Sequence, residues 1–393
     1  MADSRAANLG LWFALVFPSS LVVDKYLGRA CAIAYPIIIA LILTRKPQLS
    51  GRLSNRTLLG LALLTMSVIV IVFLAIYPVV NTHLPGAGSD DDDALNLGAM
   101  ALLTGRSPYS RATYLGNVLH HFPGAFVLAS PFVLLGTSAL QNLFWLPAFF
   151  LAIREEANSR MALQLAWLVL VLSPAVLYEV VTGTGYVSNT IYVLLGLWWL
   201  VRTKHRDAAA IAWGVTLASR ANFLFLVPLA FGFLRQHAGP RAGLRAMVLA
   251  TATTAGLTVP FYLHDRGQFG PLEAANRLLS FDQLLPHLGV ALIVMMAVLA
   301  AVLSFTRMDA AALFRNSALV QAFPVVAGVV LLTVQEGHLN LRYARYGSFF
   351  AWFTMMAYAL ESSHSRDAQT RQVAGPAKAQ RGDDPGTGAL RDR

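Results

Sequence analysis

Charged residues are scarce in this chain. Its 393 residues are 13% charged and 56% hydrophobic, whereas an ordinary globular domain carries about 25% charged residues. A soluble surface needs charge, but an ionised group deep in a bilayer costs roughly 2.5 kcal/mol or more. The shortage of charge excludes an ordinary soluble fold and indicates a protein that lies mostly in a membrane.

Cysteine is almost absent as well. The single residue, Cys31, excludes an internal disulfide, and its place in an apolar run is typical of a small core side chain. The chain is basic, with a formal net charge of +10, but its Lys and Arg residues are spread between apolar runs instead of forming one patch. Membrane lipids are therefore expected partners, and nucleic acid is not.

The sequence also lacks the common nucleotide and zinc motifs. It contains no P-loop, no G-x-G-x-x-G turn and no H-E-x-x-H pair. It leaves no stretch long enough for a cytoplasmic Rossmann domain that would hold a nucleotide sugar. If this protein transfers a sugar, the donor is therefore expected to be lipid-linked.

What the chain does have is a series of long apolar segments. A spanning helix needs about 20 mostly apolar residues. We therefore predict an all-α, polytopic transmembrane domain over residues 1–361, with an uncleaved first helix and about 10–12 spans. Segment 122–153 is long enough for a span plus a re-entrant piece, and 209–234 is expected to break at Ser219–Asn222. The candidate segments are 8–23, 28–44, 57–80, 122–153, 161–181, 187–201, 209–234, 246–263, 288–305, 317–334 and 346–361.

The connecting segments fall into a basic set and a mixed set. The positive-inside rule places the basic set, with residues such as Arg52, Arg154 and Arg202, in the cytoplasm. Residues 362–393 have almost no large apolar groups, so we expect them to form a disordered cytoplasmic tail. The mixed set, expected on the other side, is 81–121, 182–188, 264–287 and 335–346.

The loop 81–121 is the most informative of these segments. Four acidic residues, Asp90 to Asp93, precede a short amphipathic helix expected over 94–103. A helix N-terminus stabilises negative charge, which accounts for one or two of them. Crowding of four carboxylates raises the pKa of at least one. Such a group can act as a general base or bind a divalent cation, Mg²⁺ or Mn²⁺. A solvated acidic turn is the alternative.

The residues that follow carry a family resemblance. Gly105-Arg106-Ser107-Pro108-Tyr109 is a turn signal, and FPGAF…ASPF begins at Phe122. The order of acidic residues, short helix, LL-x-G-x-x-PY and FPGAF…ASPF resembles the first extracytoplasmic loop of GT-C glycosyltransferases. It is most similar to the bacterial polyprenyl-phosphate-dependent mannosyltransferases of glycosyltransferase family 87. Outside this loop and the segment after it, only the architecture is similar.

The resemblance implies a GT-C-like fold in which the loop 81–121 supplies an Asp as catalytic base. The family's spacing between the Asp and Pro-Tyr points to Asp91. The adjacent-acid form of the motif points equally to Asp92 and Asp93. Tyr109 matches the family pattern as part of the scaffold and is also a candidate substrate contact.

Three arginines are candidates for binding the donor phosphate, because the guanidinium fork matches phosphate oxygens. Arg220 lies inside an apolar segment, where a charge usually faces the protein interior or a wet cavity. The similar family segment carries a basic residue ahead of a proline, here Pro228. Arg342 and Arg345 lie before the last span, near one face of a helix. The alternatives are a structural ion pair for Arg220 and interfacial snorkelling for the other two.

Further polar residues are candidate substrate contacts. The His120-His121 pair has no partner at metal-ligand spacing, so a metal site is not expected there. Asn189 lies in a segment similar to the polar G-Q-x-N turn of related transferases, although helix capping would also explain it. Glu336 and His338 lie in the last mixed loop, on the predicted outer side.

Together these features predict an integral membrane glycosyltransferase of the bacterial inner membrane. It would move a sugar, mannose by resemblance, from a polyprenyl-phosphate donor to a glycolipid or glycan acceptor. A single carboxylate base predicts inversion at the sugar. One alternative is a transporter or lipid flippase, which a broken segment with Arg220 would also suit. Another is a membrane acyltransferase or ligase that uses His120 or His121 as its base.

Overall fold

The computed structural model describes residues 2–45, 53–84 and 89–374. Within these ranges all regular elements are helices, and the only strand-like pairing is an isolated bridge between Ala112 and Val118. The α-helices are α1 (Ala2–Leu27), α2 (Arg29–Arg45), α3 (Asn55–Val80), α4 (Asp91–Leu103), α5 (Pro123–Leu134), α6 (Leu140–Glu156), α7 (Ser159–Leu172), α8 (Pro174–Thr182), α9 (Tyr186–Arg202), α10 (Arg206–Leu217), α11 (Val227–Ala238), α12 (Pro240–His264), α13 (Pro271–Leu279), α14 (Leu288–Ser304), α15 (Ala310–Glu336) and α16 (Ser348–Ala374). The 3₁₀ helices are η1 (Pro108–Ser110), η2 (Ala221–Leu226), η3 (Ser280–Gln283) and η4 (Arg342–Gly347).

In the described part of the chain, four helices are long and apolar enough to cross a membrane. They are residues 5–27 of α1, and α3, α12 and α15. The pair α7 and α8 gives a fifth span if it is counted as one, although it bends by 83°. A helix satisfies its backbone hydrogen bonds internally, which allows it to lie in lipid. The chain is thus a helical membrane protein, and the total of about 10–12 spans stays a prediction for the shorter helices.

The outer surface of α3 agrees with this placement. Leu59, Leu63, Ile71 and Leu74 are each more than half exposed. In water a row of such side chains would be an aggregation hazard, because large apolar patches are rare on soluble monomers. Facing lipid tails, the same row costs nothing in hydration, so α3 presents a lipid-facing surface.

The expected break in segment 209–234 is present. Helix α10 ends at Leu217, the backbone of Arg220 is extended, and α11 begins at Val227 after the short helix η2. Segment 122–153 is also divided, into α5 and α6. With 12 residues, α5 is about 18 Å long, which is too short to span a bilayer.

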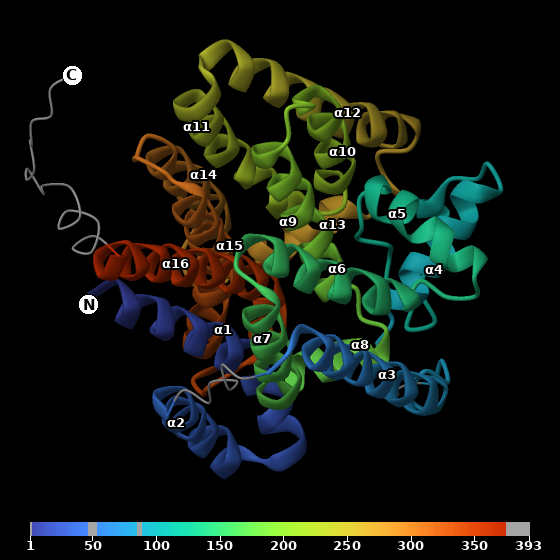
Figure 1. Cartoon of the computed structure of the whole chain (residues 1–393). Helices are drawn as coiled ribbons and strands as arrows, with labels where there is room; N and C mark the ends of the chain where they lie inside the picture. The colour runs from blue at the N-terminus through green and yellow to red at the C-terminus, as the bar shows by residue number, and fades with distance from the viewer. Residues whose placement is uncertain (1, 46–52, 85–88, 375–393) are drawn as a thin grey trace, which may run out of the picture.

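Figure 1 shows α1 and α16 side by side, with α4 and α5 at the far edge of the molecule from the N-terminus. The main core lies between α9, α10, α15 and α16, where Trp213 and Trp352 are fully buried. A smaller core cluster, which includes Leu95, Phe126 and Phe269, holds α4 against α5. This packing places the start of α4 close to the ends of several other helices.

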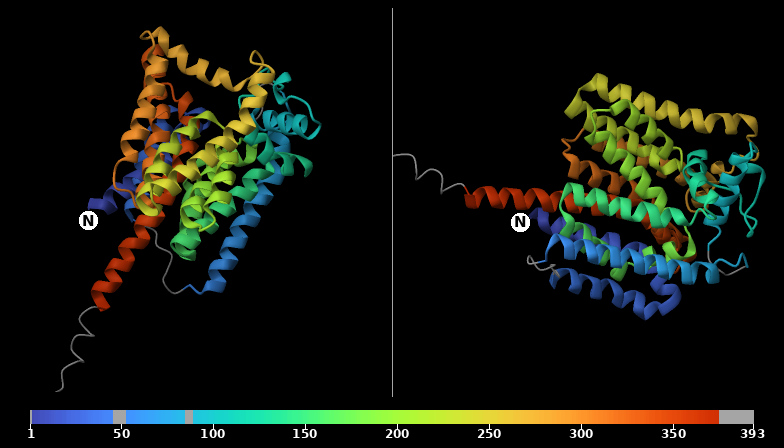
Figure 2. Two further views of the ribbon diagram at one scale, coloured as in Figure 1. Left: turned by 90° about the horizontal axis from the view of Figure 1, so that it is seen from above. Right: turned by 45° about the vertical axis from the view of Figure 1, so that its right-hand side comes forward.

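The last helix, α16, projects beyond the body of the molecule in both views of Figure 2. It is described as far as Ala374, so residues 362–374 continue this helix, although they belong to the segment expected to be a disordered tail. A helix extends cheaply once its first turns have formed, since each added residue gains a hydrogen bond. Residues 375–393 of the expected tail lie outside the described residues.

Candidate active site

The four consecutive aspartates lie at the start of α4, and they point to different partners. Asp90 is the N-cap residue, and Asp91, Asp92 and Asp93 form the first turn. The helix dipole stabilises negative charge there, which allows so many carboxylates to sit together. Their hydrogen bonds give them different roles. Asp90, Asp92 and Asp93 hold neighbouring segments together, whereas Asp91 contacts Arg220.

Asp90 and Asp93 fasten the following loop to the helix. The Asp90 carboxylate accepts hydrogen bonds from Thr113 Oγ1 at 2.8 Å and Asn117 Nδ2 at 2.7 Å. The Asp93 carboxylate accepts one from the Tyr114 backbone N–H at 2.9 Å. These bonds hold residues 111–118 in place, so both side chains have a structural role.

Asp92 ties α4 to the end of α3. Its side chain is fully buried, and Oδ2 accepts hydrogen bonds from Tyr77 Oη at 2.8 Å and from Asn81 Nδ2. Its Oδ1 is buried without a hydrogen-bond partner in the described structure. Burial raises the pKa of the Asp92 carboxyl to about 6, as expected where a charge loses its hydration. The predicted raised carboxyl is therefore found here, and burial causes it more than crowding does.

Asp91 alone turns toward the break in segment 209–234. Its Oδ1 lies 2.9 Å from Arg220 Nη2 and 3.3 Å from His121 Nε2. Its Oδ2 accepts a hydrogen bond from the Gly185 N–H at 2.7 Å. Burial alone would raise the pKa of Asp91, but the Arg220 guanidinium and the Gly185 N–H hold it below its usual range. Asp91 is therefore an ionised carboxylate in a largely enclosed site.

His121 completes this group as a neutral imidazole. Burial and the neighbouring Arg220 charge lower its pKa below the usual value. Its Nε2 lies 2.7 Å from Arg220 Nη2. Since a guanidinium only donates hydrogen bonds, this contact places the imidazole proton on Nδ1. That Nδ1 is buried without a partner in the described structure.

Arg220 is held by aromatic rings as well as by charge. Its guanidinium lies 4.9 Å from the ring centre of Tyr186 and 5.6 Å from that of Phe349. With its amide oxygen turned toward Arg220, Asn189 accepts a hydrogen bond from Nε at 2.7 Å. An arginine in a low-dielectric site needs such partners, because an unpaired buried charge is costly.

Backbone contacts bring the histidine and arginine segments together. The Phe122 N–H donates to the Ser219 carbonyl at 2.9 Å, and the Gly124 N–H donates to the Ala218 carbonyl at 2.6 Å. The start of α5 thus satisfies carbonyls left free where α10 ends. This explains why the break before Arg220 and the Phe-Pro-Gly sequence belong to one structural unit.

Arg345 reaches the same region through two neighbouring aromatic rings. Its guanidinium lies 4.8 Å from the ring centre of Tyr346, which is 5.3 Å from that of Tyr186, the ring beneath Arg220. The Arg345 charge also interacts with Asp91. Arg345 is therefore the second cation of the site, with Tyr186 and Tyr346 between the two arginines.

Arg342, Glu336 and His338 stand apart from this group. Arg342 is exposed, and its backbone N–H donates to Asn340 Oδ1 at 2.8 Å. Glu336 accepts from Asn340 Nδ2 at 2.6 Å and lies 3.4 Å from His338 Nε2. These contacts form a separate polar group at the end of α15, and none of them joins Asp91 or Arg220. The expected shared face of Arg342 and Arg345 does not bring Arg342 into the site.

His120 and Tyr109 lie behind the site. His120 Nδ1 is 3.5 Å from the Gly270 carbonyl, at the N-terminal side of α13. Tyr109 is buried, and its hydroxyl donates to the His121 carbonyl at 2.9 Å. The Tyr109 side chain thus fixes the backbone that carries His121, which is a scaffold role.

Glu179 is a buried acid of the site that the sequence analysis did not single out. Its carboxylate accepts hydrogen bonds from Ser348 Oγ at 2.5 Å and the Val187 N–H at 2.9 Å. It interacts electrostatically with Asp91 and Arg220. Glu179 joins the starts of α9 and α16, which carry the aromatic rings around Arg220. A lone acid within an apolar segment was the available signal.

A divalent cation was one of the roles that the acidic residues of the loop 81–121 could serve, and the described residues offer no cluster of protein ligands for it. Across the described ranges, no group of three or more His, Cys, Asp and Glu side chains is arranged to hold a metal ion. The four aspartates diverge toward the partners described above instead of converging on one point. Binding of Mg²⁺ or Mn²⁺ by the acidic residues of this loop stays a prediction.

No protein-family model, no curated protein and no solved structure matches this chain. The GT-C resemblance therefore rests on the sequence pattern of the loop 81–121 and the segment after it, and enters below only as part of a proposal.

Proposed function

We propose that this protein is an integral membrane glycosyltransferase. It moves a sugar, mannose by resemblance, from a polyprenyl-phosphate donor to a glycolipid or glycan acceptor at the extracytoplasmic face of the bacterial inner membrane. The observation that carries the proposal is the pairing of the Asp91 carboxylate with Arg220 at a helix break, beside a neutral His121. A base next to an anion-binding cation is what transfer from a sugar phosphate requires.

Asp91 is the general base of the proposed reaction. Its lowered pKa keeps it ionised at neutral pH, so it is ready to accept a proton. When the donor phosphate binds Arg220, the guanidinium interacts with both the phosphate and the Asp91 carboxylate. The carboxylate then becomes a stronger base at the moment it is needed, because its stabilising partner is shared.

The bonds change in one displacement. The acceptor hydroxyl gives its proton to Asp91, and its oxygen forms a bond to the anomeric carbon. The bond from that carbon to the phosphate oxygen breaks, and the polyprenyl phosphate leaves with the electron pair. Arg220 and Arg345 stabilise the negative charge on the leaving phosphate. A single displacement inverts the anomeric configuration.

The direct test is a transfer assay with purified protein. Radiolabelled polyprenyl-phosphate sugars are incubated with the protein and a membrane lipid extract, and labelled products with inverted configuration are expected. Label that crosses a vesicle bilayer without forming a new product would instead support the transporter or flippase. Acyl transfer that is lost in His121→Ala or His120→Ala, with no sugar product, would support the acyltransferase or ligase.

A further inference from the structure

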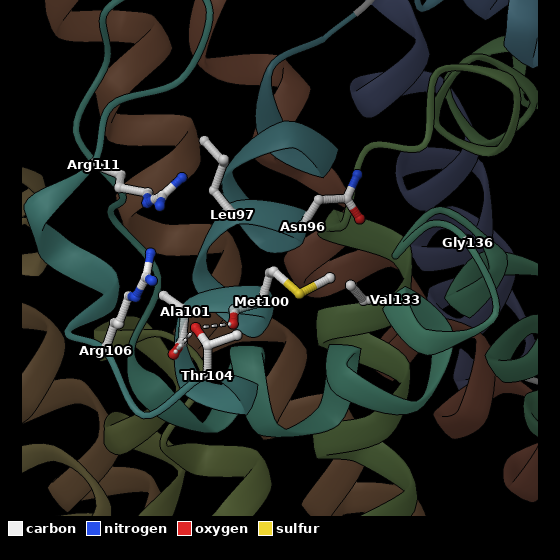
Figure 3. Close-up of a pocket in the computed structure, with 9 residues that line it drawn as sticks. All are labelled: Asn96, Leu97, Met100, Ala101, Thr104, Arg106, Arg111, Val133 and Gly136. Carbon is white, nitrogen blue, oxygen red and sulfur yellow. Dashed lines mark hydrogen bonds between the residues drawn. The ribbon is translucent and has the colours of Figure 1, made fainter.

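A pocket lies along α4 on the side away from Asp91. It has a volume of about 370 Å³, within the size range of small-ligand sites. Figure 3 shows residues from α4, from the loop after it, and from the end of α5 and the turn that follows it around this space. Asp91, His121 and Arg220 are not among its lining residues. The lining residues are Asn96, Leu97, Met100, Ala101, Thr104, Arg106, Arg111, Val133 and Gly136.

One side of the pocket carries two arginines. Arg106 and Arg111 are both exposed, and in Figure 3 their guanidinium groups lie near one another at the same edge. Within the described part of the chain, neither guanidinium is in an ion pair. Two like charges at one pocket repel, and an anion bound between them would remove that repulsion.

The other side of the pocket is apolar and opens toward an apolar surface. Leu97, Met100 and Val133 form this side. Immediately after Val133, Leu134 and Leu135 are 70% and 75% exposed. In a membrane protein such side chains belong in lipid, because water would leave them poorly solvated. The pocket therefore joins an anion-binding edge to a lipid-facing edge.

We propose that this pocket binds a membrane lipid with an anionic phosphate headgroup. The guanidinium groups of Arg106 and Arg111 hold the phosphate, because planar donor pairs match its oxygens. The first part of the acyl chains lies over Met100 and Val133 toward Leu134. The inference depends on the membrane setting of the chain and not on sugar transfer, so either proposal can fail alone.

The test is native mass spectrometry of the full chain in mild detergent. The probes are phosphatidylglycerol, phosphatidylcholine, polyprenyl phosphate and inorganic phosphate, each added separately and then in competition. We expect phosphatidylglycerol to bind, and the double variant Arg106→Gln with Arg111→Gln to bind it at least about tenfold more weakly. Arg266→Gln is the matched control. Arg266 is also exposed on the predicted outer side and should be silent.

A second variant tests the apolar edge. Met100 is 47% exposed, so the Met100→Gln variant should fold normally. It should bind phosphatidylglycerol more weakly and inorganic phosphate equally well. Four outcomes would overturn the proposal. These are unchanged binding in the double arginine variant, equal binding of phosphatidylcholine, full competition by equimolar inorganic phosphate, and preferential binding of polyprenyl phosphate, which would assign the pocket to the sugar donor.

Discussion

At Asp92, burial and charge are in conflict. The side chain is fully buried, one carboxylate oxygen has two donors, and the other has none in the described structure. The raised pKa of about 6 records the cost of ionising such a group. Because the unfolded chain ionises Asp92 at its ordinary value, the contribution of Asp92 to stability falls as pH rises through this range.

Replacing Asp92 by Asn should remove that pH dependence. The folded chain holds the Asp92 proton more tightly than the unfolded chain, so the contribution of Asp92 to wild-type stability is greatest at low pH and declines between about pH 4 and 6. A rise of about two pKa units corresponds to about 3 kcal/mol. Relative to wild type, Asp92→Asn should therefore gain up to about that much in unfolding free energy between pH 4 and 7.

This difference can be measured by unfolding both proteins in mild detergent across the pH range. Other titrating groups, Asp91 included, are common to both proteins and cancel in the comparison. A constant difference in unfolding free energy from pH 4 to 7 would mean that Asp92 does not ionise as described.

The role of each aspartate could be predicted only in part. The sequence indicates that one of four crowded carboxyls has a raised pKa, and it points to Asp91 to Asp93 as candidate bases. It cannot separate them, because their partners come from distant positions such as Tyr77 and Gly185. A rotation of about 100° between successive helix residues sends neighbouring side chains to different neighbours.

At the scale of elements, the site depends on how closely α5 approaches α10. A Cβ atom on Gly124 would collide with the backbone carbonyls of Val215 and Ala218. Gly124→Ala should therefore push α5 outward, cost about 1–3 kcal/mol and separate His121 from Arg220. Thermal unfolding in detergent measures the cost, and sugar transfer measures the effect on the site.

Gly256→Ala is the matched control for this change. Gly256 lies within α12 with open space around its Cα. Alanine is the better helix former there, by roughly 0.5–1 kcal/mol. Equal behaviour of the two variants would contradict the close packing of α5 on α10.

The break that carries Arg220 could be predicted, because polar residues interrupt an apolar run at 219–222. The role of Glu179 could not be predicted. It depends on Ser348, which follows much later in the chain, and on Val187, which lies on the next helix. Sequence patterns report where a helix ends more readily than which helix ends meet.

At the scale of the molecule, the length of α9 sets the separation between the site and the basic loop at Arg202. It begins beside Gly185, which binds Asp91, and ends at Arg202, which pairs with Glu156. Its 17 residues give about 25 Å, close to the thickness of a hydrocarbon core. The site and the basic loop at Arg202 therefore lie at opposite ends of the helix.

Cysteine labelling tests this sidedness. Cys31 is exposed, so the test begins from Cys31→Ala. A new cysteine at Leu115, near the site, should react with a membrane-impermeant maleimide in intact spheroplasts. One at Lys204 should react only after permeabilisation, because positive loops stay in the cytoplasm. The reverse pattern would place the site in the cytoplasm and rule out the proposed outer-face reaction.

The membrane class and helical nature of the chain were predictable from composition, because charge is too costly in lipid to be common. The number of membrane spans was harder to predict from the sequence. Apolar runs such as 161–181 fold as bent pairs, here with a Ser173-Pro174 break, and hydrophobicity alone does not distinguish a bent pair from a straight span.

The central claim is that Asp91 is the base of a sugar transfer, and the rate of transfer by Asp91→Asn tests it most directly. Asn keeps the shape of Asp but cannot accept the proton, so transfer should fall by about 10²–10⁴-fold. Asp90→Asn is the control, because Asp90 only fastens the loop through Thr113 and Asn117; it should keep most activity at equal expression. Wild-type transfer by Asp91→Asn would contradict the account.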